Sequence, residues 1–242
     1  MAKKRVNGES KRQMRANSSI ITRTVGQDEI HKRILVVGEG VNTEPSYFEK
    51  FKEPHVVVVP IGLGEGTCKL VHDVEGHKEE EERKLGKKFD EVWVAFDKDS
   101  FPDFEQAIAE ARDKGYQVAY SNQAVEYWFI LHFMDHQGAG MSRNEYAKTL
   151  NALLKKEGIA LKYDPDAKEV SEELFNVLYK RLQLAYDRAE KVYCFKQSCG
   201  NPTEESVTTI HLLVKSIKGM TSTAEQRKLK GKEESMRKAG LI

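Results

Sequence analysis

The chain has 242 residues, of which 32% are charged and 39% hydrophobic, with a formal net charge of +1 at pH 7. This length permits one large domain, or one domain with a helical addition. No run approaches the roughly 18 apolar residues of a membrane span, and the N-terminus lacks the apolar core of a signal peptide. Three cysteines do not form a disulfide framework. We therefore expect a cytoplasmic protein with no membrane partner.

The near-neutral charge conceals two basic ends. Residues 1–32 are rich in Lys and Arg and lack hydrophobic periodicity, so we predict a flexible basic arm. Residues 219–242 form a second basic segment, which we predict to be a tail. Basic ends can neutralise nucleic-acid phosphates. The alternative is that both ends are merely solvated.

Four short runs rich in Val, Ile and aromatic residues are typical of buried strands. These runs cover residues 34–40, 56–61, 92–99 and 116–120. Each is followed by a helical pattern, and this alternation predicts a mostly parallel sheet sandwiched by helices. We assign residues 33–137 to this α/β core.

After residue 138 the strand patterns stop, and residues 138–218 are predicted to be a helical portion packed on the core. Helices are expected over residues 142–156, 171–193 and 203–218. The first has Ser142 as N-cap and Glu145 three positions later, which is a capping box.

Three carboxylates follow two of the predicted strands. Glu39 lies at the end of the first, and Asp97 and Asp99 lie at the end of the third. Open α/β sheets bind ligands outside the carboxyl ends of their strands. Acids gathered there need a neutralising cation, and oxygen ligands favour Mg²⁺ or Mn²⁺, one or two ions. The alternatives are an N-cap role for Asp99 and a surface ion pair for Glu39.

Further polar residues lie near the same edge. Glu126 begins an apolar helix after the fourth strand. Its carboxylate needs a partner among these apolar residues, which makes Glu126 a fourth candidate metal ligand. Glu44 lies in a first helical turn, where the helix dipole alone would favour an acid. Asn122 and Asn201 are additional candidates, although the Asn201-Pro202 pair also suits a loop.

Three lysines are candidate nucleic-acid contacts: Lys69, Lys98 and Lys196, for which a merely solvated helix face is the alternative. Lys69 follows the glycine-rich turn 62–67, whose backbone N–H groups could bind phosphate, although a flexible turn explains it equally well. We expect His132, on an apolar helix, to be a core histidine rather than a catalytic one.

Several short motifs together resemble the RloB-like family, whose members carry a Toprim-type catalytic domain. They are Gly38-Glu39-Gly40, Thr43-Glu44-Pro45, Asp97-Lys98-Asp99, Ser121-Asn122 with Glu126-Tyr127-Trp128, and Asn201-Pro202-Thr203. The resemblance runs from about Arg33 to about Lys218 and departs from the family pattern at Gln123-Ala124. It implies a Toprim-like fold and a metal-dependent, phosphodiester-cutting protein of bacterial antiphage defence and abortive infection.

The first functional hypothesis is an enzyme, a Mg²⁺-dependent nuclease acting on DNA or RNA, with tRNA among the candidates. Glu39, Asp97 and Asp99 would be catalytic through the metal, or Glu39 would be the general acid/base. The alternative is a non-catalytic nucleic-acid-binding effector that works with an AAA- or ABC-type ATPase. A phosphatase of the haloacid dehalogenase type is a third reading, which the strand order and Ser100 oppose. A homo-oligomer is an open alternative to a monomer.

Overall fold

The computed structural model describes residues 32–38, 43–60, 67–98, 102–167, 169–220 and 223–238. The chain divides into two units after His31, and all of these residues belong to the second. The predicted arm, apart from Lys32, lies outside the described residues. So do two of the predicted site residues, Glu39 and Asp99.

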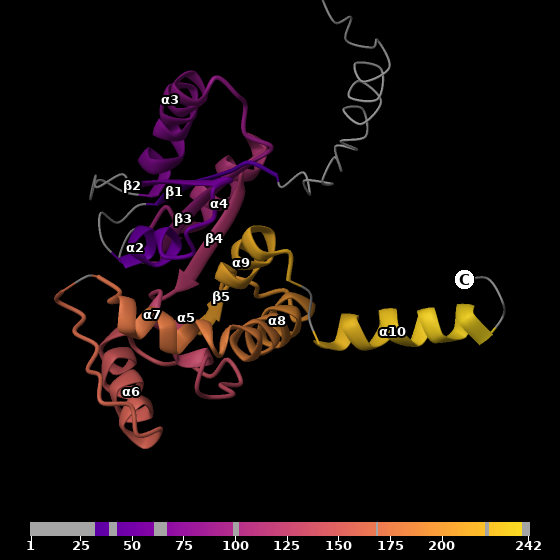
Figure 1. Cartoon of the computed structure of the whole chain (residues 1–242). Coiled ribbons are helices and arrows are strands. Elements are labelled where there is room, and N and C mark those ends of the chain that lie inside the picture. The colour runs from indigo at the N-terminus through magenta and orange to yellow at the C-terminus, as the bar shows by residue number, and fades with distance from the viewer. Residues whose placement is uncertain are drawn as a thin grey trace, which may run out of the picture. The chain divides into compact units, whose positions relative to one another are not determined.

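The core of the described unit is a five-stranded sheet in the order β2-β1-β3-β4-β5 (Figure 1). Its strands are β1 Ile34–Gly38, β2 Val56–Pro60, β3 Glu91–Asp97, β4 Gln117–Asn122 and β5 Val207–Thr208. The first four are parallel, and β5 pairs antiparallel with β4. The predicted mostly parallel sheet is confirmed.

Helices cover both faces of this sheet, which explains why the middle residues of its central strands are mostly apolar. Ile34 and Val36 of β1 belong to one core, with α2 Thr43–Glu49 and α5 Glu126–Leu131. Leu35 and Val37 face the opposite core, with α3 Thr67–Leu85 and α4 Phe104–Asp113. The predicted helical sandwich is thus confirmed.

The C-terminal part is mostly helical, as predicted. Its helices are α6 Arg143–Lys156, α7 Glu172–Tyr179, α8 Leu182–Ser198, α9 Ile210–Lys218 and α10 Thr223–Lys238. At the start of α6, the Glu145 carboxylate accepts hydrogen bonds from the Ser142 N–H at 2.8 Å and the Ser142 hydroxyl at 2.6 Å. Most of the segment predicted only as a basic tail is the helix α10.

Two predictions for this part were wrong. The single helix expected over residues 171–193 is two helices, because the chain leaves helical geometry at Arg181, with φ −110° and ψ 10°. The helix expected from residue 203 begins only at Ile210, because residues 207–208 form β5. Within the described ranges, no helix is long and apolar enough to cross a membrane.

Candidate functional site

The strand order creates a switch point at the carboxyl ends of β1 and β3. From β1 the chain goes to β2 on one side and then to β3 on the other side of β1. Ligands of open α/β sheets bind at such a point. Asp97 is the last residue of β3. Glu39 follows Gly38, the last residue of β1, but its place in the site and that of Asp99 stay predictions.

Three buried carboxylates interact at this edge of the sheet: Glu44 from α2, Asp97 from β3 and Glu126 from α5. Each residue is only 8% exposed. The Glu44 and Asp97 side chains act on each other's pKa, and the charge of Glu126 raises the pKa of both. The structure therefore brings the candidates Glu44 and Glu126 into one group with Asp97.

The electrostatics of this group disfavour three negative charges. Burial raises the pKa of Asp97 well above its ordinary value, and the Glu44 and Glu126 charges raise it further. Burial also raises the pKa of Glu44, despite opposing hydrogen bonds from its own backbone and from Asp97. With the pKa of both acids raised, three negative charges in this group are unfavourable without a proton or a cation.

Two oxygens of this group are buried without a hydrogen-bond partner: Asp97 Oδ1 and Glu126 Oε2. A buried carboxylate oxygen without a donor is costly, and a hard divalent cation would satisfy it. As they stand, however, the described residues contain no group of three or more His, Cys, Asp or Glu side chains arranged to hold a metal ion. The acids fit a cation but do not form a complete ligand set by themselves.

A tyrosine that the sequence analysis did not identify completes the surroundings of Glu126. The Tyr163 hydroxyl donates to Glu126 Oε1 at 2.7 Å. Tyr163 lies between α6 and α7, and the Asn151 side chain binds its backbone N–H and carbonyl at 2.7 and 2.9 Å. A single tyrosine in a loop has no periodic pattern, so the sequence offered no signal for it.

Arg143 is a second residue that acts on these acids and was not predicted from the sequence. It is the exposed first residue of α6, and its charge lowers the pKa of both Glu44 and Asp97. Its backbone N–H donates to Gln123 Oε1 at 2.8 Å, which fixes the start of α6 beside the end of β4. The positive charge of this exposed residue thus partly offsets the repulsion among the carboxylates.

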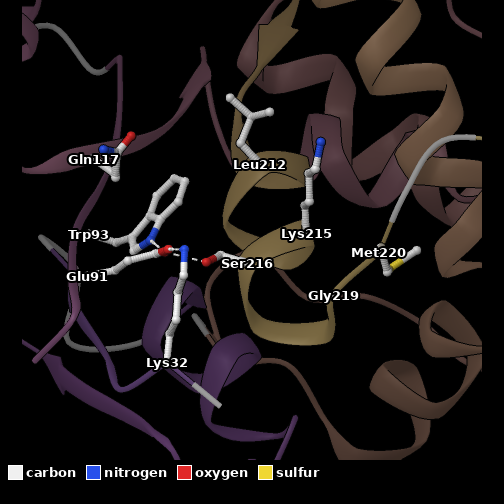
Figure 2. Close-up of a pocket in the computed structure, with 9 residues that line it drawn as sticks. All are labelled: Lys32, Glu91, Trp93, Gln117, Leu212, Lys215, Ser216, Gly219 and Met220. Carbon is white, nitrogen blue, oxygen red and sulfur yellow. Dashed lines mark hydrogen bonds and ion pairs between the residues drawn. The ribbon is translucent and has the colours of Figure 1, made fainter. Parts of the chain in front are cut away.

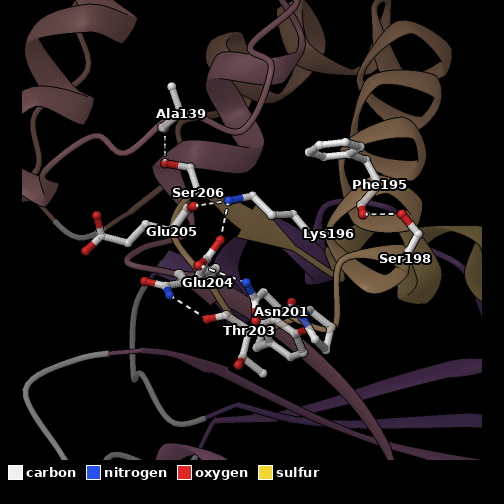
Figure 3. A network of polar contacts seen from close by, with 12 residues as sticks. Ala139, Phe195, Lys196, Ser198, Asn201, Thr203, Glu204, Glu205 and Ser206 are labelled. Carbon is white, nitrogen blue, oxygen red and sulfur yellow. Dashed lines mark hydrogen bonds and ion pairs between the residues drawn. The ribbon is translucent and has the colours of Figure 1, made fainter.

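The two predicted asparagines have different surroundings. Asn122, the last residue of β4, is buried, and its Nδ2 donates to the Thr203 carbonyl at 2.7 Å, while its Oδ1 has no partner. Asn201 is exposed and donates to Glu204 Oε1 at 3.2 Å (Figure 3). The Tyr120 hydroxyl also donates to the Pro202 carbonyl, at 2.7 Å. The segment that includes Asn201 is therefore tied to β4.

The predicted nucleic-acid contacts are also dissimilar. The Lys196 side chain is only 13% exposed; it pairs with Glu204 at 2.7 Å and donates to the Glu205 carbonyl at 2.9 Å (Figure 3). Lys98 Nζ lies 5.5 Å from the centre of the Phe104 ring. Lys69 is exposed on α3. The Lys196 charge is thus engaged within the fold, and nucleic-acid binding by these lysines stays a prediction.

His132 is a core residue in the structure. It is 1% exposed, and its Nδ1 hydrogen-bonds to the Trp128 carbonyl at 2.9 Å. Burial lowers its pKa to about 3, so the ring is neutral at physiological pH. This agrees with the structural role expected for it.

A cavity of about 670 Å³ lies at the other edge of the sheet, where β3 and β4 begin (Figure 2). Trp93 and Gln117 line it from the strands, and Leu212 and Lys215 line it from α9. The Glu91 carboxylate in its wall accepts hydrogen bonds from Lys32 at 2.7 Å, from Trp93 Nε1 at 3.0 Å, and from Ser216. This acid is satisfied within the protein.

The fold and site define a three-layer α/β protein with acids gathered at the switch point of its sheet. The family model described as RloB-like protein matches residues 34–217, so the chain belongs to the RloB-like protein family. The predicted family is therefore confirmed. No curated protein and no solved structure matched the chain.

Proposed function

We propose that this protein is a metal-dependent nuclease that hydrolyses phosphodiester bonds in DNA or RNA. The observation that carries the proposal is the pair of buried, unpartnered oxygens, Asp97 Oδ1 and Glu126 Oε2, within a group of three acids at the switch point. Such oxygens are suited to hard cations, and divalent cations serve phosphoryl chemistry in many nucleases.

Asp97 and Glu126 would hold the cation, with Glu44 as a neighbouring ligand and with Glu39 and Asp99 as the predicted remaining ligands. Mg²⁺ or Mn²⁺ bound there would polarise the phosphate and lower the pKa of a bound water. Arg143 would bind the phosphate through its guanidinium, which suits anionic oxygens. In the other role that the sequence leaves open, Glu39 would be the general acid/base and would accept the proton of the attacking water.

A role in bacterial antiphage defence and abortive infection is proposed from the family resemblance, and with it a Toprim-type site and action in the cytoplasm. The sequence contains nothing that resembles an ATP-binding motif. An energy-dependent defence system would therefore require a partner ATPase, of the AAA or ABC type. Assembly into a homo-oligomer is compatible with action either with or without a partner ATPase.

The test is cleavage by the purified full chain. Labelled tRNA, duplex DNA and single-stranded DNA are incubated with Mg²⁺, Mn²⁺ or EDTA, using the wild type and Asp97→Asn. We expect one polymer to be cut with metal by the wild type only, because Asn lacks the charge that a cation requires. Equal cutting by Asp97→Asn, or cutting in EDTA, would contradict the proposed site.

A second candidate is a nucleic-acid-binding effector without catalysis. Two observations favour it: the described residues alone form no metal-binding group, and five basic side chains of α10 are exposed among those described. They are Arg227, Lys228, Lys230, Lys232 and Arg237. This candidate predicts salt-dependent binding of a nucleic acid with no cleavage in either metal, with or without an ATPase partner.

A further inference from the structure

We propose that Tyr163 is a positioning residue, which holds Glu126 so that one carboxylate oxygen is fixed and the other is reserved for the cation. This inference rests on the proposed function, because it assigns a role toward the same metal. Tyr163 would not touch the metal or the substrate. It would act through Glu126.

The hydrogen bonds of Glu126 are unequal. Its Oε1 accepts from the Tyr163 hydroxyl at 2.7 Å, whereas its Oε2 is buried with no partner. A tyrosine hydroxyl has one hydrogen to donate, so it can satisfy only one of the two oxygens. Residues that hydrogen-bond a ligating carboxylate in this way orient it toward the metal.

Tyr163 is itself held in place. Its backbone N–H and carbonyl both bind the Asn151 side chain on α6, and its ring lies edge-on to Phe129 at 6.1 Å between centres. The residue is 3% exposed. A donor fixed at backbone and ring can define the orientation of Glu126, which a mobile one could not.

The connection that carries Tyr163 also reaches the helix that supplies Glu44. The Val170 N–H, seven positions after Tyr163, donates to Ser46 Oγ on α2 at 3.0 Å. One segment between α6 and α7 therefore contacts a residue two positions from Glu44 and also Glu126 itself. This placement suits a segment that sets the spacing of the acids.

A second tyrosine–glutamate pair shows what a purely structural contact looks like. The Tyr116 hydroxyl donates to Glu75 Oε2 at 2.5 Å, and Glu75 Oε1 accepts from Lys78 at 2.8 Å. Both oxygens of Glu75 are therefore satisfied. Glu126 differs in two respects that matter for a cation: its second oxygen has no partner, and the residue is buried whereas Glu75 is exposed.

The experiment compares Tyr163→Phe with Tyr116→Phe in the full chain. Each change removes one hydroxyl and keeps the ring. Mn²⁺ affinity is measured by calorimetry, and the bound ion by electron paramagnetic resonance. We expect Tyr163→Phe to weaken Mn²⁺ binding by about 10-fold or more and to alter the resonance spectrum, since supporting hydrogen bonds are typically worth this much. Tyr116→Phe should leave both measurements unchanged.

A double-mutant cycle separates positioning from packing. In a Glu126→Gln background, Tyr163→Phe should have no further effect on Mn²⁺ affinity, because its route to the metal is gone. If Tyr163→Phe fails to fold, Asn151→Ala is used instead. It loosens the same segment and should weaken Mn²⁺ binding by a smaller factor. Unchanged affinity in the folded variant would then overturn the inference.

The possible failures are distinguishable. If the wild type binds no Mn²⁺, both the proposed function and this inference are wrong. If the wild type binds Mn²⁺, Glu126→Gln weakens it and Tyr163→Phe does not, then only the positioning role is wrong. If Tyr163→Phe and Tyr116→Phe weaken binding equally, the effect is general loss of packing and the inference is also wrong.

Discussion

The two ends of β3 each carry a partly or fully buried acid, and the two acids have opposite surroundings. Glu91 begins the strand and Asp97 ends it, seven residues that span about 20 Å. Burial alone would raise the pKa of Glu91, but hydrogen bonds from Lys32, Ser216 and Trp93 outweigh it, and the pKa is lowered. At Asp97, burial and the Glu44 and Glu126 charges raise the pKa together.

The difference lies in the neighbours, since both acids belong to one strand. An acid with three donors is stable as an anion and has a structural role. An acid beside two other acids needs a proton or a cation, and such a requirement is typical of functional sites. The amino edge of the sheet is therefore the satisfied edge, and the carboxyl edge is the one that should respond to metal.

The largest expected effect is on cleavage. Glu126→Gln and Glu91→Gln make the same chemical change at the two edges. We expect Glu126→Gln to reduce kcat by about 10²–10³-fold or more, because it removes a charge from the reacting centre. Glu91→Gln should leave kcat unchanged. Both are measured on the polymer that the wild type cuts, and a similar loss in both variants would remove the functional distinction between the edges.

The next effect is on stability without metal. Asp97→Asn should raise the free energy of unfolding in EDTA, because it relieves repulsion among three acids. Glu91→Gln should lower it by about 1–3 kcal/mol, because it weakens hydrogen bonds to a charged group. Urea unfolding monitored by circular dichroism measures both changes. Destabilisation by Asp97→Asn would mean that repulsion among these acids does not limit the stability of the metal-free protein.

The pH dependence should have opposite signs at the two ends. The folded pKa of Asp97 is raised, so its contribution to stability is full below about pH 4, its unfolded value, and is lost as the pH rises through the raised pKa. The folded pKa of Glu91 is lowered, so its contribution is present above about pH 4 and is lost as the pH falls through the lowered pKa.

Unfolding temperatures in EDTA across this range would measure the dependence. The wild type should lose stability relative to Asp97→Asn as the pH rises from about 4, which is the pKa of Asp97 in the unfolded chain. Relative to Glu91→Gln, it should lose its advantage as the pH falls below about 4. Parallel curves for all three proteins would show that neither acid is shifted as described.

The smallest effect should come from Ser216, one of the three donors to Glu91. Ser216→Ala removes one hydrogen bond while Lys32 and Trp93 remain. We expect a loss of about 1 kcal/mol in unfolding free energy and unchanged cleavage. Calorimetric unfolding and the cleavage assay measure the two quantities. A clear loss of cleavage would mean that the amino-edge cavity takes part in function.

The sequence predicted the parts of this molecule that produce regular patterns. The runs that became β1 to β4 are rich in Val, Ile and aromatic residues, because most of their residues are buried or partly buried between helices, and they were recognised. β5 was missed because two residues are too few for a pattern. The break at Arg181 was missed because Leu178 and Leu182, both buried, keep helical spacing across it without Gly or Pro.

The site was predicted only in part, because only some of its residues lie next to regular sequence patterns. Asp97 and Glu126 lie next to strong strand and helix patterns. Tyr163 and Arg143 are distant from Glu44 and Asp97 in the sequence, and only the fold relates them to the acids. Glu44 was open between a helix-dipole role and a site role, and its burial and electrostatic interaction with Asp97 connect it to the site. Neither Glu39 nor Asp99 is among the described residues, so these two stay predictions.

The pairing of β5 with β4 has a consequence for the order in which the chain folds. The hydroxyls of Ser121 and Thr208 meet at 2.8 Å, although 87 positions separate them. Contacts of this separation form late, because a long loop must close first. During synthesis, the outer edge of β4 therefore stays unpaired until Thr208 has left the ribosome. An unpaired edge is a template for aggregation, so we expect chains that stop before β5 to be much less soluble than the full chain.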